Sequence, residues 1–374
     1  MAALTEEQTL IRDQAKSWVT EQSPVRKFRE LRDAKVPAAY APDAWKAMVE
    51  MGWTGILVPE EYGGSDLGYL TFGLILEELG RQLTASPLLA SALAGTSAVL
   101  LGGSDAQKQQ WLPQVVDGSA VLTLAVDEGP RHAPERIATT AKASGDGYVI
   151  DGTKSFVLEG MAATAFVVAA RLDGSDETAL LLVPADAAGV TRTALATADS
   201  RGYARVAFAG VTVGDDALLA SAPAGTKLLE AVLDRARAGV AAEMLGTALQ
   251  AFDMTLEYLK TRKQFGKVIG SFQGLGHRAA DMFSGGELTR SCVEAALQAI
   301  DSGADDVAEL TSLAKTKAGD YLHLVSNELI QMHGGIGMTD EYDAGFYLKR
   351  ARALEATYGN QAFHRERYAR ILGY

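Results

Sequence analysis

Three long segments toward the C-terminus have the periodicity of amphipathic helices, and they constrain the fold more than any other feature of the chain. They cover residues 226–262, 273–301 and 305–333. In the first segment, apolar residues such as Leu229 and Leu233 recur at steps of three and four, which places them on one helix face. A helix of about 30 residues is about 45 Å long, more than a small domain needs. We therefore expect a four-helix-type bundle that an oligomer partner extends.

Glycines mark two positions in these helices. Gly334 and Gly335 follow Met332 and are predicted to end the third segment. Gly285 and Gly286 are predicted to interrupt the second.

The rest of the chain changes character near residue 120. Before it, Thr5 begins a capping box with Gln8, and Asp43 and Pro87 begin further helices. After it, β-branched runs are bounded by Gly, Asp and Pro without a helix between them, so we expect an antiparallel sheet or small barrel. The sequence thus predicts a mainly α protein with a central β domain. Its predicted domains are a helical domain over residues 1–118, a β domain over 119–222 and a helical bundle over 223–374.

Composition excludes several classes of function. The chain has 35 basic and 47 acidic residues, and its formal net charge of −12 disfavours binding to nucleic acid. The single cysteine, Cys292, excludes an intrachain disulfide framework, and five histidines without short helical spacing favour no metal site. The N-terminus does not read as a secretory signal, and no apolar run reaches the ~18 residues of a spanning helix. We expect a cytoplasmic protein without a membrane span.

Two stretches have a more specific meaning. Residues 261–273 read TRKQFGKVIGSFQ, and residues 331–342 read QMHGGIGMTDEY. Together they resemble the acyl-CoA dehydrogenase family, whose N-terminal signatures are similar to PEEYGGSDLG at 59–68 and WLPQVVDGS at 111–119. The order of the parts resembles this family across essentially the whole chain. The resemblance implies an N-terminal helical domain, a middle β-barrel and a C-terminal four-helix bundle.

The resemblance also implies an activity. Members of the family are FAD-dependent oxidoreductases that convert an acyl-CoA thioester to its 2-enoyl product. A carboxylate base removes the proton next to the carbonyl while the flavin accepts a hydride from the next carbon. We accordingly expect FAD as cofactor, acyl-CoA as substrate, an electron-transfer flavoprotein as electron acceptor, and a dimer or tetramer of identical or related subunits.

The two stretches supply the candidate FAD contacts. By resemblance, the first reaches the FAD of a neighbouring subunit and the second lets the backbone approach the dinucleotide. The simpler alternative for the first stretch is a surface arginine beside a core phenylalanine, and for the second it is an ordinary glycine stop of a helix. His333 is expected to have a packing role and to transfer no proton. The candidates are Arg262, Gln264, Phe265, Gln331, Gly334 and Gly335.

The expected catalytic residue departs from the family pattern. The usual catalytic glutamate aligns with Tyr358. A tyrosine has an ordinary pKa of about 10, so it cannot replace a carboxylate as the base at neutral pH. An alternative position, just before Arg237, holds Ala236. Glu243 lies two turns further along the same face as Ala236, where burial is expected to raise its pKa toward that of a useful base. The alternative is a structural acid paired with an arginine. Expected substrate contacts are Arg237, Val240 and Tyr358.

The β domain departs from the family as well. Asp127 takes the place of a threonine near the flavin, and Leu158 replaces a threonine that normally donates near flavin N5. Phe156 can still cover the flavin ring. These three residues complete the cofactor candidates.

The departures leave three functions open. The first is an active acyl-CoA dehydrogenase with a displaced glutamate. The second is a non-catalytic or FAD-contributing subunit of a heteromeric acyl-CoA dehydrogenase, since AAEMLG and TYGNQAFH resemble the small subunit of pimeloyl-CoA dehydrogenase. The third is another flavin-dependent oxidation on the same fold.

Overall fold

The computed structural model describes residues 4–173, 178–219 and 225–374. The chain forms two compact units, each assembled from segments far apart in sequence. We call Met1–Arg29, Tyr69–Thr84 and Arg237–Tyr374 the helical unit, and Glu30–Gly68 and Ala85–Ala236 the β unit. The division into three domains by sequence position stays a prediction. In the described ranges, no helix combines the length and apolar character needed to cross a membrane.

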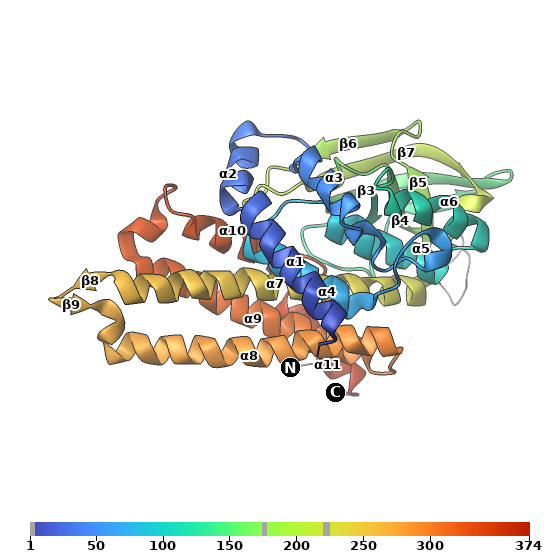
Figure 1. Cartoon of the computed structure of the whole chain (residues 1–374). Helices are drawn as coiled ribbons and strands as arrows, with labels where there is room; N and C mark the ends of the chain where they lie inside the picture. The colour runs from blue at the N-terminus through green and yellow to red at the C-terminus, as the bar shows by residue number, and fades with distance from the viewer. Residues whose placement is uncertain (1–3, 174–177, 220–224) are drawn as a thin grey trace. The chain divides into compact units, whose positions relative to one another are not determined.

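The helical unit is built on the long helices that the periodicity predicts. Thr5 and Gln8 form the predicted capping box at its first helix, each side chain accepting from the other's backbone N–H at 3.1 Å. Figure 1 shows α8 and α9 running along each other, and β8 and β9 where α7 passes into α8. The helices are α1 (Glu6–Gln22), α4 (Gly68–Arg81), α7 (Gly225–Thr261), α8 (Gln273–Ser302), α9 (Val307–His333), α10 (Ala344–Ala356) and α11 (Gln361–Ile371); α4 and α7 begin in the β unit. The shorter elements are β8 (Lys263–Gln264), β9 (Lys267–Val268), η5 (Ile269–Ser271) and η6 (Gly334–Met338).

One prediction about this unit is wrong. α8 runs without a break through Gly285 and Gly286. A Cβ on Gly286 would lie 2.7 Å from the hydroxyl oxygen of Tyr321 on α9. The glycines therefore allow close packing between α8 and α9, and this packing supports the helix where local propensity is weak.

The β unit contains a seven-stranded sheet in the order β1-β4-β2-β3-β7-β6, with β5 paired to β4. β1 and β2 each pair with β4 in parallel, which corrects the expectation of a purely antiparallel sheet; the other pairs are antiparallel. The strands are β1 (Leu122–Ala125), β2 (Thr140–Ala143), β3 (Gly147–Val157), β4 (Ala165–Leu172), β5 (Thr178–Pro184), β6 (Val190–Ala194) and β7 (Ala204–Gly214). Its helices are α2 (Val25–Ala34, which begins in the helical unit), α3 (Pro42–Glu50), η1 (Trp53–Gly55), η2 (Glu60–Tyr62), η3 (Leu89–Gly95, a π-helix), α5 (Thr96–Gly102), α6 (Asp105–Val116) and η4 (Asp215–Ala217).

The end of β3 is irregular, and this irregularity matters for the site. Lys154 pairs with Val206 and Val157 with Ala204, so the register of β3 and β7 shifts between them. The shift contains Phe156, whose φ of 53° is positive. A bulge of this kind redirects side chains that would otherwise alternate along the strand.

Candidate active site

The first candidate flavin-binding segment, residues 261–273, connects α7 to α8. Arg262 directly follows α7, and its backbone N–H donates to the carbonyl of Tyr258 at 2.9 Å. β8 and β9 then form a hairpin with Phe265 in its turn. Phe265 has a φ of 54°, is 88% exposed and makes an edge contact with Phe272 at 6.0 Å between ring centroids. The hairpin therefore presents an aromatic ring at the surface of the helical unit.

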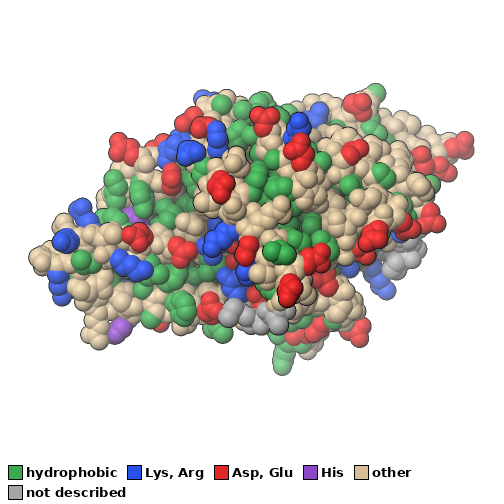
Figure 2. All heavy atoms as spheres, in the orientation of Figure 1, with side chains coloured by type: hydrophobic (Ala, Val, Ile, Leu, Met, Phe, Trp, Pro, Cys, Tyr) green, Lys and Arg blue, Asp and Glu red, His purple; other side chains and the backbone are tan. Residues whose placement is uncertain are grey.

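The second segment, residues 331–342, lies beside the first. The ring of Tyr258 stacks on His333 at 4.1 Å between centroids, and its hydroxyl donates to the carbonyl of His333 at 3.4 Å. Gly334, with a φ of 62°, then turns the chain into η6. Because Tyr258 is one turn before Arg262, the two motifs meet at one end of the helical unit. Figure 2 shows basic side chains gathered at the end where Figure 1 places β8 and β9.

His333 has a structural role in this junction. Its Nδ1 lies 2.7 Å from the carbonyl oxygen of Leu329, and its Nε2 lies 2.9 Å from the hydroxyl of Tyr342. Burial lowers the pKa of His333, so the imidazole is neutral at neutral pH. The residue packs between two aromatic rings, as expected.

The joined motifs fit a dinucleotide. The side chains of Arg262, Gln264 and Gln331 are exposed. A Cβ placed on Gly334 or Gly335 would have no atom within 4 Å beyond its own chain neighbours. A phosphate can therefore approach this backbone closely, a guanidinium can pair with it, and the exposed ring of the hairpin can pack against a flat group.

Tyr358 lies in a tight turn between α10 and α11. Its φ is 53° and that of Gly359 is 107°, and Asn360 then caps α11 by accepting from the N–H of Phe363 at 3.0 Å. Arg237 Nε on α7 donates to the carbonyl of Tyr358 at 3.3 Å. Tyr358 is 6% exposed. The structure thus brings together Arg237 and Tyr358, two of the three expected substrate contacts.

A buried lysine lies beneath this turn. Lys315 on α9 is 1% exposed, and its Nζ donates to the carbonyls of Leu354, Glu355 and Gly359 at 3.0, 3.3 and 2.9 Å. Burial lowers the pKa of Lys315 to about 7; the charge of Glu355 opposes this shift, and that of Arg237 adds a smaller lowering. The ammonium group is therefore held by backbone dipoles.

Glu243 lies in the middle of α7, where α7 crosses α4. It is 6% exposed, and a Cβ on Gly80 of α4 would lie 2.3 Å from its carbonyl oxygen. Val240, the third expected substrate contact, is fully buried one turn earlier. The acid is therefore buried, as its place on the apolar stripe predicts. Another acid, Glu355 on α10, lies three residues before Tyr358 and forms an ion pair with Arg352.

The candidates of the β unit lie around the end of β3. Asp127 accepts from His132 Nδ1 at 2.9 Å, and its carbonyl accepts from the N–H of Ser155 at 2.7 Å. Phe156 is 49% exposed, so its ring is available to a flat partner. Leu158 is 4% exposed, and its carbonyl accepts from Thr123 Oγ1 at 2.6 Å.

A second buried lysine supports this edge. Lys154 is completely buried, and its Nζ donates to Glu128 Oε1 at 2.7 Å and to the carbonyl of Val126 at 3.0 Å. Burial lowers the pKa of Lys154 to about 8, against the opposing effect of the Glu128 carboxylate. The salt bridge anchors β3 two residues before Phe156.

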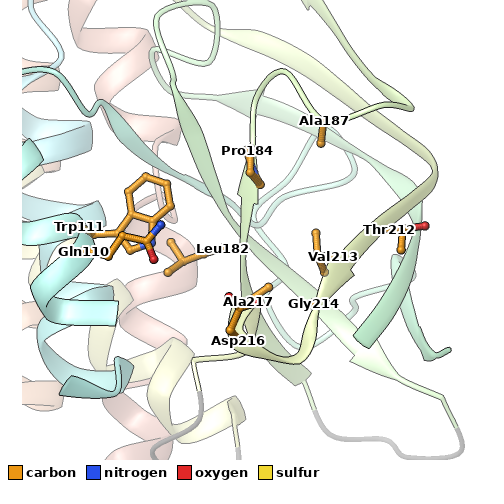
Figure 3. Close-up of a pocket in the computed structure, with 10 residues that line it drawn as sticks. All are labelled: Gln110, Trp111, Leu182, Pro184, Ala187, Thr212, Val213, Gly214, Asp216 and Ala217. Carbon is orange, nitrogen blue, oxygen red and sulfur yellow. The ribbon is translucent and has the colours of Figure 1, made fainter. Parts of the chain in front are cut away.

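The β unit also has a recess away from these candidates. It has a volume of about 200 Å³ and lies between α6 and the strands β5 and β7 (Figure 3). Gln110 and Trp111 line one side, and Leu182, Pro184 and Val213 line the other. Asp216 is the one charged residue among those lining it. The recess therefore lacks a cluster of groups for chemistry.

Sequence reasoning missed Lys154, Glu128, His132, Lys315 and His364. A lysine in a strand or helix usually indicates a solvent-facing position. Lys315 offers a signal in retrospect, because it follows Ala314 on the buried face and lies on the apolar stripe of its segment. Its partners come from a turn far along the chain, which spacing alone does not reveal.

Three family models match the chain in order. They are described as the N-terminal, middle and C-terminal domains of acyl-CoA dehydrogenase and match residues 5–119, 127–212 and 224–373. A probable acyl-CoA dehydrogenase of Bacillus subtilis, YngJ, is 31% identical over 380 residues, which cover 99% of this chain and 98% of that protein.

Solved structures agree with these matches. The steroid acyl-CoA dehydrogenase variant Tcur3481-Tcur3483 superposes with a TM-score of 0.89 at 30% identity and covers 98% of both chains. The ChsE4-ChsE5 complex of Mycobacterium tuberculosis gives a TM-score of 0.91 at 28% identity, with 100% of this chain and 99% of that chain covered.

The chain belongs to the acyl-CoA dehydrogenase family. It is an FAD-dependent oxidoreductase that acts on acyl-CoA, and the predicted class, cofactor and mainly α fold with a central β sheet are confirmed.

Proposed function

We propose that the chain oxidises an acyl-CoA thioester to the 2-enoyl-CoA, with FAD bound where two subunits meet. The observation that carries the proposal is the meeting of the motifs 261–273 and 331–342 at one exposed end of the helical unit, joined by Tyr258 and His333. Residues presented outward in this way suit a cofactor held mainly by a neighbouring subunit. The contacts to the neighbour's FAD are Arg262, Gln264, Phe265, Gln331, Gly334 and Gly335.

The β unit supplies the remaining flavin contacts in this proposal. Phe156 covers the ring, Leu158 forms an apolar wall, and Asp127 accepts a hydrogen bond. Bound FAD supplies the hydride acceptor. The protein orients the thioester and removes water from around it.

We assign the role of base to Glu243. A buried carboxylate on α7 can accept the proton from the α-carbon of the thioester, provided that the substrate lies along Arg237, Val240 and Tyr358. Tyr358 then shapes the site and transfers no proton. We further propose an electron-transfer flavoprotein as acceptor, a ring-bearing or otherwise bulky acyl group, and a cytoplasmic location.

A second candidate function is that of one subunit in a heteromeric acyl-CoA dehydrogenase. It is favoured by the similarity to two structures whose names join two proteins, Tcur3481-Tcur3483 and ChsE4-ChsE5, and by the resemblance to the pimeloyl-CoA dehydrogenase small subunit. Purifying the chain alone and with the product of a neighbouring related gene separates the two functions. If the chain alone contains flavin that acyl-CoA reduces, the first function is supported. If bound flavin and its reduction are found only when the two proteins are purified together, the second function is supported.

The shared FAD site has its own test. We expect Arg262→Glu to lose the flavin on gel filtration, because it places a negative charge where a phosphate pairs. Lys260→Glu, an exposed charge reversal one residue before the end of α7, is the matched control and should keep it. Unchanged circular dichroism shows that both variants fold. Full flavin retention in Arg262→Glu contradicts the assignment.

A further inference from the structure

The turn Thr357–Gly359 is held by more donors than a surface turn needs. Tyr358 has a positive φ, a conformation that is unfavourable for a residue with a bulky side chain. Its carbonyl accepts from Arg237 Nε at 3.3 Å and lies 3.1 Å from His364 Nε2. The carbonyl of Gly359 accepts from Lys315 at 2.9 Å. Residues from three helices, α7, α9 and α11, thus fix the strained Tyr358 and the glycine that follows it.

The protonation state of His364 is defined by this geometry. Because a carbonyl oxygen only accepts, Nε2 must carry the proton that it donates to Tyr358. Burial, together with the charges of Lys315 and Arg237, lowers the pKa of His364 and keeps the ring neutral. Nδ1 is then a bare acceptor, and it has no hydrogen-bond partner among the described residues. The ring therefore acts as a fixed donor to the turn.

Burying these groups is costly, which argues for a role. Arg237, Lys315 and His364 are each at most 1% exposed. Lys315 donates to neutral carbonyls, and the nearby charge of Glu355 offsets its desolvation only in part, because the pKa of Lys315 is still lowered to about 7. Strained residues persist where their surroundings over-determine them, and such places are often functional.

We propose that Lys315, supported by Arg237 and His364, is a positioning residue that locks the turn Thr357–Gly359 and so fixes how Tyr358 limits the acyl group of the substrate. The second half of this inference rests on the proposed function, in which Tyr358 contacts the substrate. The first half, the locked turn, depends only on the contacts within the helical unit. The two halves can therefore fail separately.

The locked turn is tested by amide hydrogen exchange in the full-length flavoprotein. Lys315→Met keeps the length of the side chain and removes its donors. Exchange at residues 357–360 should then be faster by about tenfold or more, the factor expected for one lost hydrogen bond. Lys317→Met, two residues further along α9 and partly exposed, is the matched control and should leave this exchange unchanged. Unchanged exchange in Lys315→Met overturns the proposal.

Specificity is tested by a double-variant cycle with two acyl-CoAs of different bulk. Tyr358→Ala should change the ratio of their kcat/KM values, and Lys315→Met should change it in the same direction. Combined, the two changes should be clearly less than additive, because both act through one side chain. Additive effects, or an unchanged ratio in Lys315→Met, overturn the specificity half. If the wild type oxidises no acyl-CoA, the proposed function fails while the exchange result still decides the locked turn.

A second pair of variants covers the case in which Lys315→Met does not fold. His364→Leu removes a single donor to the carbonyl of Tyr358, and His364→Gln restores an N–H donor at a similar reach. Exchange at residues 357–360 should rise in the first variant and return toward the wild-type rate in the second. Equal exchange in both variants overturns the proposal.

Discussion

The two units each bury one lysine completely, and they do so in different ways. In the β unit, Lys154 is paired with the carboxylate of Glu128 at 2.7 Å. In the helical unit, Lys315 faces three backbone carbonyls. Burial lowers both pKa values, to about 8 for Lys154 and to about 7 for Lys315. A carboxylate favours the protonated form of each lysine, Glu128 for Lys154 and Glu355 for Lys315, but only Glu128 is hydrogen-bonded to its lysine, and the charge of Arg237 also opposes protonated Lys315.

The difference shows two uses of a buried charge. Lys154 binds the carboxylate of Glu128 and the carbonyl of Val126 and anchors a strand, two residues before Phe156 adopts a positive φ in the bulge that follows. Lys315 binds the backbone itself and holds the turn that contains Tyr358. Strain in both places is balanced by a buried ammonium group nearby. The group that each buried lysine binds therefore determines whether the lysine fixes a strand or a turn.

The largest expected effect comes from breaking the pair in the β unit. Glu128→Gln leaves Lys154 buried without its counter-charge, and the free energy of unfolding should fall by about 3 kcal/mol. The double variant Glu128→Gln with Lys154→Met removes the charge as well and should recover part of the loss. Urea unfolding of the three proteins measures this. A loss below ~0.5 kcal/mol in the single variant contradicts the described role of the pair.

An effect that is smaller over any single pH unit is expected in the pH dependence of stability. The pKa of Lys315 is about 7 in the folded chain against an ordinary 10.5, so between these values only the unfolded chain holds the proton. The contribution of this group to the free energy of unfolding is therefore fully present above pH 10.5, falls as the pH drops from 10.5 to about 7, and is constant below that. The free energy of unfolding of the wild type minus that of Lys315→Met should rise by up to about 1.4 kcal/mol per pH unit between pH 7 and 10.5.

Urea unfolding at several pH values, with Lys317→Met as control, measures this slope. The ionisable groups that face Lys315 or its neighbour His364 are Glu355 on α10, Arg237 on α7 and Arg367 on α11. A difference that does not vary with pH contradicts the buried, carbonyl-bound ammonium.

The smallest effect tests the cause of the difference between the two lysines. Arg237→Met removes the positive charge that disfavours protonated Lys315. The pH at which the Lys315-dependent slope begins should then move upward, toward that of Lys154. The measurement is the same pH series, made with Arg237→Met and with its combination with Lys315→Met. An unmoved midpoint shows that the charge of Arg237 is not what separates the two lysines.

Much of the helical unit could be predicted because its signals are local. The heptad-like stripes in α7 and α9, the Thr5 capping box and the glycine stop at Gly334 each depend on residues close in sequence. Gly285 and Gly286 misled the prediction because Tyr321, on another helix, decides the outcome. Tertiary packing overrode local propensity there.

The β unit and the site were less predictable for the same reason. Alternating strands do not reveal that β1 and β2 pair in parallel with β4. The flavin motifs could be found because they are contiguous, and the structure brings them together through Tyr258 and His333. The contacts that hold Tyr358 could not be predicted, because Lys315 and His364 belong to different helices and become neighbours only in the folded chain.

We propose Glu243 as the base of this acyl-CoA dehydrogenase family member. The most direct measurement is the rate at which a good acyl-CoA bleaches the bound flavin in stopped flow, compared between wild type, Glu243→Gln and Glu257→Gln, an exposed acid on the same helix. We predict that Glu243→Gln binds FAD normally but is reduced at least ~10²-fold more slowly, whereas Glu257→Gln matches the wild type. Reduction of Glu243→Gln at the wild-type rate contradicts the claim and leaves Glu243 as a buried structural acid.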